Sequence, residues 1–261
     1  MLTFEKIQSA VFITIYVSIF STLIAFFLSM IFGYLIAIYQ FQLKKPIVIF
    51  LSSLTSIPPV CAGLLVYILI SRSGPLGWME ILYSPLAMII AQIVIIFPIM
   101  ITLIIKNIEE DYPIYRDELM SYGASKKDII FILFSNKTNI YITVLLLGFG
   151  RAISEYGAAA IVGGSIDHFT RNMTATIALE TSKGNVSLGI ILGVILISLT
   201  LLISISLKEV EIDQHLNFFG SSDEGLSLRT PSPKPLETLK EKIISITFSP
   251  ALITSLGGVL F

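Results

Sequence analysis

Long stretches without a charged residue alternate with polar segments along this chain. Four of them run from Val11 to Tyr39, Pro46 to Ile70, Ile81 to Ile105 and Asn185 to Leu207. A helix that spans a bilayer needs about 20 mostly apolar residues, because all its backbone polar groups must pair within the segment. A fifth stretch, Asn139 to Ile166, qualifies if it tolerates Arg151 and Glu155. The pattern predicts an all-α membrane protein with five core transmembrane helices.

The chain changes character after the last of these stretches. Residues 208–242 are polar and contain Ser and Pro, which is typical of a linker or tail. Residues 243–261 are apolar but only marginally long enough to span, and they contain Pro250 and Gly257-Gly258. We predict a transmembrane domain over residues 1–207 and a polar tail over 208–242. We leave 243–261 unassigned, as a possible sixth hydrophobic segment.

Composition agrees with a membrane location and excludes several classes of function. Of 261 residues, 54% are hydrophobic and 13% are charged, whereas soluble proteins carry about 25% charged residues. The formal net charge of -1 excludes a basic nucleic-acid footprint. Cys61 is the one cysteine, so there is no internal disulfide and no zinc pattern. We therefore expect no metal site and no nucleic-acid partner.

The distribution of Lys and Arg predicts the orientation, because cytoplasmic loops carry an excess of them. One set of connections contains Lys44, Lys45, Lys106, Arg116, Lys126, Lys127 and Lys137, and the other contains Lys6, Arg72, Arg171 and Lys183. The first apolar stretch is too long for a signal-peptide core, so we interpret it as a retained span. The N-terminus is then predicted outside, with the loop of residues 107–138 and the tail after Lys208 in the cytoplasm.

Prolines interrupt two of the predicted spans. Pro58 and Pro59 fall in the middle of the second, and Pro98 falls late in the third. Each proline removes an intrahelical hydrogen bond and bends or breaks a helix. Such a break either improves packing or marks a place where the helix lines a pathway.

The predicted cytoplasmic loop contains two potential short helices. Pro113 can open one that runs through Tyr122, Gly123 breaks it, and Ser125 with Asp128 forms a plausible capping pair for the next. The exposed side of such a loop suits a groove on another protein. The alternative is a solvated loop that only follows the charge bias.

Two segments carry a resemblance to a known family. The sequence DELMSYGAS, residues 117–125, resembles the cytoplasmic loop motif of binding-protein-dependent ABC importer permeases, although Glu118 stands where alanine is usual. The sequence from Gly148 to Asn185, which begins GFGRAISEYGAA, closely resembles the permeases for tungstate and their molybdate and sulfate relatives. Weaker agreement extends over roughly Val11 to Leu207.

The resemblance implies a permease of the type I ABC importer fold in the inner membrane. Two copies of the chain would form the pathway, an extracytoplasmic binding protein would deliver an oxyanion, and two cytoplasmic ATPases would drive transport. The chain has no G-x-x-x-x-G-K-[ST] phosphate loop, so ATP-Mg would bind the ATPases and this chain would need no cofactor and be no enzyme. The residues that the motif assigns to ATPase coupling are Asp117, Glu118, Tyr122, Gly123, Ala124 and Ser125.

Arg151 and Glu155 are charges inside an otherwise apolar stretch. A charge at the bilayer centre costs about 2.5 to 3.5 kcal/mol on insertion scales, so both should face protein or water. Their i,i+4 spacing permits a neutralising ion pair on one helix face. They are either a structural pair or part of the pathway wall; capture of a dianion by Arg151 is less attractive, because Glu155 opposes it and a tight site would retain the substrate.

The external segment after the fourth span supplies further candidates. Gly163-Gly164 ends the helix, and Thr170, Arg171 and Thr174 follow, with a short helix predicted from about Asn172. Hydroxyl and amide groups suit a tetrahedral dianion, because they offer neutral hydrogen bonds that exchange stepwise. A plain external loop helix is the alternative.

From these features and the resemblance we predict a homodimeric permease of an oxyanion importer, most similar to those for tungstate. Two alternatives remain open. A molybdate or sulfate permease would share nearly all of them. An ion-coupled secondary transporter would be expected to show internal repeats and more intramembrane acids, and neither is evident.

Overall fold

The computed structural model describes residues 2–121, 123, 125–136 and 138–220. The chain divides into two compact units, Met1–Asn217 and Phe218–Phe261. Nearly all of the second unit, including the unassigned segment 243–261 and most of the predicted tail, lies outside the described residues. Apart from residues 218–220 at the end of the last helix, everything that follows lies in the first unit.

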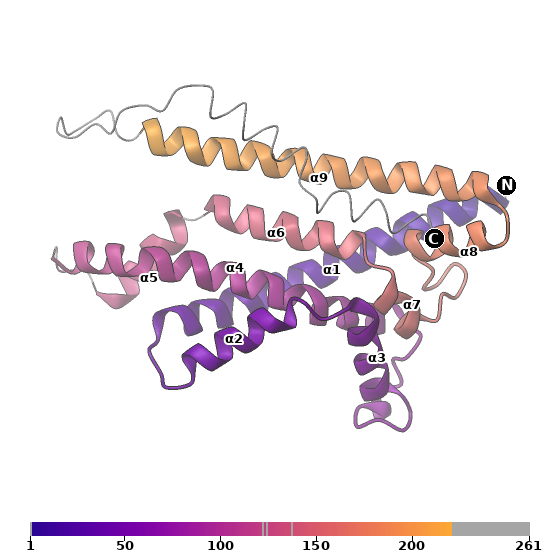
Figure 1. Ribbon diagram of the computed structural model, residues 1–261, viewed down its shortest axis with the longest axis horizontal. Coiled ribbons are helices and arrows are strands. Elements are labelled where there is room, and N and C mark those ends of the chain that lie inside the picture. The colour runs from indigo at the N-terminus through magenta and orange to yellow at the C-terminus, as the bar shows by residue number, and fades with distance from the viewer. Residues whose placement is uncertain (1, 122, 124, 137, 221–261) are drawn as a thin grey trace. The chain divides into compact units, whose positions relative to one another are not determined.

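The described residues form helices and their connections (Figure 1). In chain order these are α1 (Leu2–Ile38), α2 (Lys44–Leu54), α3 (Pro59–Ile70), the short 3-10 helix η1 (Gly77–Met79), α4 (Pro85–Ser121), α5 (Lys126–Asn136), α6 (Thr138–Ile153), α7 (Gly157–Gly163), α8 (Met173–Ser182) and α9 (Val186–Gly220).

The five predicted spans appear as three single helices and two bent pairs. By length and composition, α1, α4 and α9 are each able to cross a membrane. The pair α2 and α3 bends by 106°, and the pair α6 and α7 bends by 60°. If each pair counts as one span, the number of spans reaches five. The prediction of an all-helical membrane protein agrees with this arrangement.

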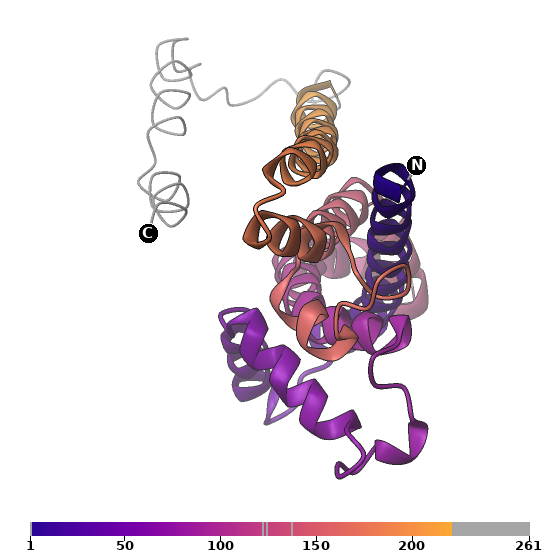
Figure 2. The same cartoon turned by 90° about the vertical axis from the view of Figure 1, so that its right-hand side faces the viewer.

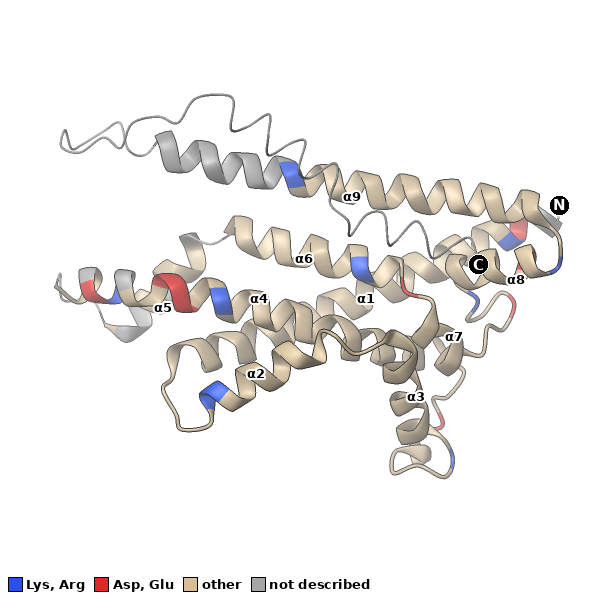
Figure 3. Ribbon diagram, viewed as in Figure 1, with Lys and Arg blue, Asp and Glu red and all other residues tan. Residues whose placement is uncertain are grey.

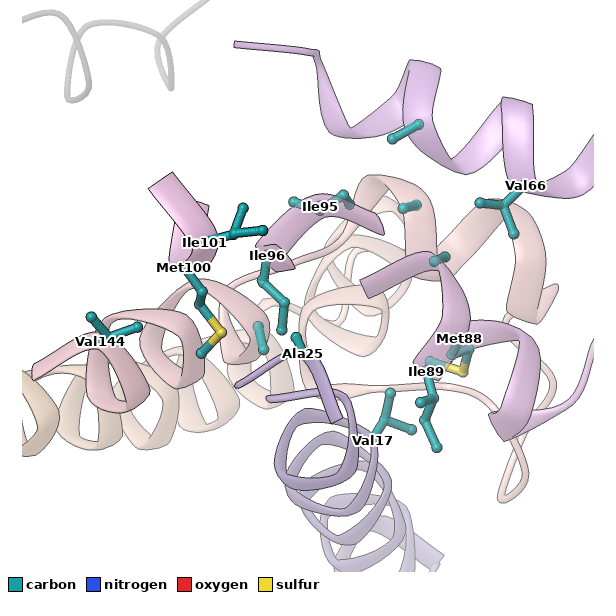
Figure 4. Close-up of a cluster of buried hydrophobic side chains, with 14 of the residues drawn as sticks. Val17, Ala25, Val66, Met88, Ile89, Ile95, Ile96, Met100, Ile101 and Val144 are labelled. Carbon is teal, nitrogen blue, oxygen red and sulfur yellow. The ribbon is translucent and has the colours of Figure 1, made fainter. Parts of the chain in front are cut away.

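The core lies where α1 and α4 pack along each other, with α6 and α3 beside them. Val17 and Ala25 of α1 face Ile89 and Ile96 of α4, and Val144 of α6 completes the cluster (Figure 4). Seen along the helices, α2 and α3 lie to one side of this bundle (Figure 2). The second span, made of α2 and α3, therefore packs on α4 and α7 from one side and is not surrounded by other helices.

The charged side chains are concentrated toward the two ends of the helices (Figure 3). The ribbon between the ends is largely tan, and the blue residue within α6 is Arg151. At one end Lys44 bonds to Glu109 at 2.8 Å and to the carbonyl of Ala37 at 2.7 Å. This ion pair joins the end of α1 and the start of α2 to α4.

Two predictions about prolines in α4 are wrong. The helix continues through both Pro98 and Pro113, so Pro98 does not break the third span and Pro113 does not open a separate loop helix. A proline inside a helix costs one hydrogen bond, and neighbouring groups or water can compensate. The carbonyl left without its helical N–H at Pro98 is that of Val94, in a residue that is 44% exposed, and Pro113 is exposed to solvent.

The last helix is also longer than predicted. The apolar stretch ends at Leu207, but α9 runs to Gly220 and includes residues that we assigned to the tail. Lys208, Glu209 and Glu211 are good helix formers and no proline follows them before Pro231, so the helix does not end where the hydrophobicity ends.

Candidate functional site

The two bent spans meet at their breaks. Gly63 of α3 packs so closely on α7 that a Cβ atom on it would lie 2.5 Å from the Cα atom of Ala158. One turn earlier, a Cβ atom on Gly157 would lie 2.7 Å from a methyl group of Val60. The first turns of α3 and α7 are therefore in direct contact, and both breaks lie in one region.

The break between α2 and α3 follows from its two prolines. Pro58 adopts an extended conformation with ψ of 133°, as a residue before proline favours, and Pro59 begins α3. Because neither proline has an N–H group, a helix continued through them would lose two consecutive hydrogen bonds. The predicted break at Pro58 and Pro59 is present.

At the break between α6 and α7 the Ala152 carbonyl accepts the backbone N–H of Glu155 at 3.2 Å, in place of a partner four residues on, and it also takes a bond from another helix. The side-chain amide of Gln92 in α4 donates to the Ala152 carbonyl at 3.1 Å. The hydroxyl of Ser21 in α1 donates to the Gln92 side-chain oxygen at 2.7 Å. Three helices are thus joined at the end of α6, and Gln92 is a structural residue that we did not predict.

Glu155 lies within this second break and is only 3% exposed. One carboxylate oxygen accepts a hydrogen bond from Nη1 of Arg151 at 2.9 Å. The other oxygen accepts the backbone N–H of Ala158, in the first turn of α7, at 3.2 Å. The predicted ion pair is present, but it bridges a helix break instead of lying along a single helix face.

The backbone carbonyl of Glu155 receives a second set of bonds. The amide of Asn172 donates to it at 3.2 Å and the hydroxyl of Thr174 at 3.0 Å. Asn172 also caps α8, because its side-chain oxygen accepts the N–H of Ala175 at 2.9 Å. The short helix predicted from about Asn172 is therefore present, and its N-terminus is attached to the break.

Helix α8 is fixed to other elements at both ends. At its start, the N–H of Met173 donates to the hydroxyl of Thr14 in α1 at 2.8 Å. At its end, Glu180 is buried and accepts from the side chain of Asn185 at 3.0 Å. This hydrogen bond, together with Lys183 at 3.6 Å and Lys6 at 3.9 Å, lowers the pKa of Glu180.

Two of the predicted candidates lie away from the break. The hydroxyl of Thr170 donates to the Gly163 carbonyl at 2.5 Å and accepts the N–H of Ile166 at 2.9 Å. Arg171 binds the Ser165 carbonyl and pairs with Asp167 at 3.0 Å. Both side chains hold the loop after α7 in shape. Of the candidates after α7, Thr174 reaches the break.

A cavity of about 120 Å³ adjoins the break between α2 and α3. It is lined by Leu54, Thr55, Ile57, Ala62, Leu65, Val94, Ile95, Ile99 and Arg151. The Arg151 side chain, 35% exposed, is the charged group in this lining. Arg151 thus pairs with Glu155 in the break between α6 and α7, and it also lines the cavity beside the break between α2 and α3.

The predicted coupling loop turns at Gly123, where φ is 84°. This left-handed conformation favours glycine, so the predicted break at Gly123 is present. Tyr122 and Ala124 lie outside the described residues, as does the side chain of Glu118. Asp117 is exposed next to Arg116, with an N–O distance of 3.6 Å. Ser125 directly precedes α5.

Helix α5 is held by an apolar and aromatic contact. Ile129 and Leu133 are fully buried. The Phe134 ring lies 5.2 Å from that of Tyr141 in α6 and 6.2 Å from that of Tyr34 in α1, and the two tyrosine hydroxyls are hydrogen bonded. The turn at Gly123 therefore connects two helices that are both anchored in the bundle.

The described residues contain no group of three or more His, Cys, Asp and Glu side chains able to hold a metal ion.

No protein-family model matches the chain. A tungstate uptake system permease protein from Peptoclostridium acidaminophilum is 37% identical over 203 residues, which cover 76% of this chain and 87% of that protein. The chain belongs to the tungstate permease family.

Other relatives agree with this assignment. A probable anion ABC transporter permease protein from Haloferax volcanii is 36% identical over 167 residues, or 62% of this chain and 72% of that protein. A second tungstate uptake system permease protein, from Campylobacter jejuni, is 35% identical over 159 residues, or 61% and 66% of the two chains. Sulfate transport permeases match at lower identity. This permease is a multi-pass membrane protein with a role in transport.

Proposed function

We propose that this permease forms the membrane pathway of an ATP-driven importer for tungstate in the inner membrane. The observation that carries the proposal is the similarity to a tungstate permease over most of both chains. The described part of the fold agrees with it, because two broken spans meet at a charged pair. In a membrane, irregular backbone is tolerated where it is buried in protein or lines a water-filled cavity.

The proposal gives ATP hydrolysis to other chains. The sequence contains no phosphate loop, so ATP-Mg binds two cytoplasmic ATPase subunits, and this chain binds no cofactor. The end of α4, the turn at Gly123 and the start of α5 form the contact with each ATPase. Two copies of the permease, in the type I importer arrangement, surround the pathway, and a binding protein delivers the oxyanion from outside.

Molybdate or sulfate is the second candidate substrate. Sulfate permeases are among the more distant relatives, and all three anions are tetrahedral and divalent. The test is uptake into proteoliposomes that contain the permease, its ATPase and its binding protein. We expect ATP-dependent uptake of tungstate to exceed that of molybdate and sulfate at equal concentration. Faster uptake of sulfate would contradict the tungstate assignment, and absence of all uptake would contradict the proposed function.

The proposed orientation can be tested with single cysteines in a Cys61→Ser background. Ser73 follows α3 and Lys126 begins α5, so the two residues lie at opposite ends of the second to fourth spans. We expect a membrane-impermeant thiol reagent to label Ser73→Cys in intact cells and Lys126→Cys only after permeabilisation. The reverse pattern would place the Gly123 turn outside and contradict the ATPase contact.

A further inference from the structure

Arg151 has a guanidinium group that its ion pair uses only in part. Among the residues that the structure describes, Glu155 is the one bonded partner, and it contacts Nη1. A guanidinium has five N–H donors in a planar fork, so further donors remain after this contact. The same side chain is 35% exposed and lines the cavity beside the break between α2 and α3.

Glu155 opposes an anion near Arg151 less than the sequence alone suggests. Its second oxygen accepts the Ala158 N–H at 3.2 Å, so the carboxylate is compensated from two sides. Glu155 is 3% exposed and does not line the cavity, whereas Arg151 does, so the guanidinium is the charge that borders the cavity. The arginine, which is further out, therefore contributes net positive potential to the cavity.

The cavity is large enough for a small anion and otherwise offers little to retain one. Its volume of about 120 Å³ far exceeds the roughly 10 to 15 Å³ that one water needs. Most of its lining is aliphatic, from Leu54 and Ile57 at the break to Val94 and Ile99 of α4. The hydroxyl of Thr55 already donates to the Ser52 carbonyl at 2.7 Å. One partly engaged cation in an apolar wall binds weakly, and a site that must release its ion needs weak binding.

We propose that this cavity is a transient station for a tetrahedral divalent oxyanion, held by the free N–H groups of Arg151. Glu155 is the positioning residue, because its ion pair holds the guanidinium at the cavity wall. The same pair lowers the positive potential there enough for the anion to leave. The inference rests on the proposed function and names where the transported anion pauses.

The test measures the local potential with thiol reagents at the cavity wall. Thr55→Cys in a Cys61→Ser background places a thiol in the lining, within the assembled complex in proteoliposomes. We expect an anionic methanethiosulfonate to react faster there than a cationic one, and Arg151→Gln to lower the ratio of the two rates about tenfold. Millimolar tungstate should slow the anionic reaction. The matched control, Ser73→Cys, should show a ratio that Arg151→Gln does not change.

A second variant tests the cavity without changing any charge. Val94→Phe fills the cavity from the exposed face of α4. We expect Val94→Phe to reduce tungstate uptake at least tenfold while the complex with the ATPase still forms. The control is Leu86→Phe, an exposed position of α4 outside the cavity lining, which should retain uptake. This pair keeps the test valid if Arg151→Gln fails to fold.

The outcomes separate the inference from the proposed function. The station is refuted if the wild-type complex transports tungstate but the rate ratio at Thr55→Cys does not depend on Arg151, or tungstate gives no protection. Unreduced uptake by Val94→Phe would refute it as well. If the wild-type complex takes up no oxyanion at all, the proposed function itself fails, whatever the thiol rates show.

Discussion

The contact between Gly63 and Ala158 allows a quantitative prediction for the place where the two broken spans meet. We choose the substitution Gly63→Ala, which adds one methyl group. That methyl carbon would lie 2.5 Å from the Cα atom and 3.0 Å from the Cβ atom of Ala158. Ala158 is fully buried, and its backbone cannot turn aside as a flexible side chain could. Helices α3 and α7 must therefore move apart.

The expected cost follows from two opposing effects. Overpacking of a tight contact costs about 1 to 3 kcal/mol, and a clash with backbone belongs at the upper end of that range. Replacing a helical glycine by alanine returns about 1 kcal/mol through helix propensity. The net loss is about 2 kcal/mol, which corresponds to a melting temperature lower by about 4 to 8 °C for a chain of this size.

The matched control is Gly193→Ala in α9, where an added Cβ atom meets nothing within 4 Å. It has the propensity gain without the clash, so the melting temperature should rise by about 2 to 4 °C. The purified permease in detergent is heated to a series of temperatures, and the fraction still folded is measured by size-exclusion chromatography. Tungstate uptake is the second measurement. Equal melting temperatures for the two variants would refute the close approach of α3 and α7.

Three further predictions concern charges and turns. Gly123→Val should insert normally but transport poorly, because a β-branched residue is strained at φ of 84°, whereas Gly123→Asn should retain more uptake. Arg151→Met should destabilise by about 3 kcal/mol, because it leaves the buried Glu155 unpaired, and the double variant with Glu155→Gln should recover much of that loss in the same melting assay. Because the pKa of Glu180 is lowered by its bond from Asn185, its stabilising contribution is full above the usual value of 4.5 and is lost as pH falls through the lowered pKa. Glu180→Gln should remove this acid-dependent part of the melting curve, and an unchanged curve would contradict the assignment.

The sequence was sufficient to predict the features that depend on local composition. The five apolar stretches, the break at Pro58 and Pro59, the turn at Gly123 and the start of α8 at Asn172 are all present in the structure. Each rests on hydrophobicity over a span or on the backbone restrictions of Pro, Gly and a capping residue. Such signals need no knowledge of the surroundings.

The predictions that failed depended on tertiary context. Pro98 and Pro113 carry the same local signal as Pro58, but they are single prolines and the helix tolerates the loss of one bond at each. The break at Ser154 to Tyr156 has no proline, and it becomes favourable because Gln92, Asn172 and Thr174 pair the freed carbonyls. These partners lie far away in sequence, so the interval 151–155 alone could not reveal the break.

Helix α4 extends without interruption from Pro85 to Ser121 and has 37 residues. At a rise of about 1.5 Å per residue its length is roughly 55 Å. One end borders the Gly123 turn, and Gln92 near the other end is bonded to the last turn of α6. If the helix tilts about its middle by about 5°, each end moves by roughly 2 to 3 Å, and Gln92, about 16 Å from the middle, moves by roughly 1.4 Å. A shift of that size along the bond would lengthen the 3.1 Å contact between Gln92 and Ala152 beyond hydrogen-bonding range, so a tilt of α4 at its Gly123 end reaches the break between α6 and α7.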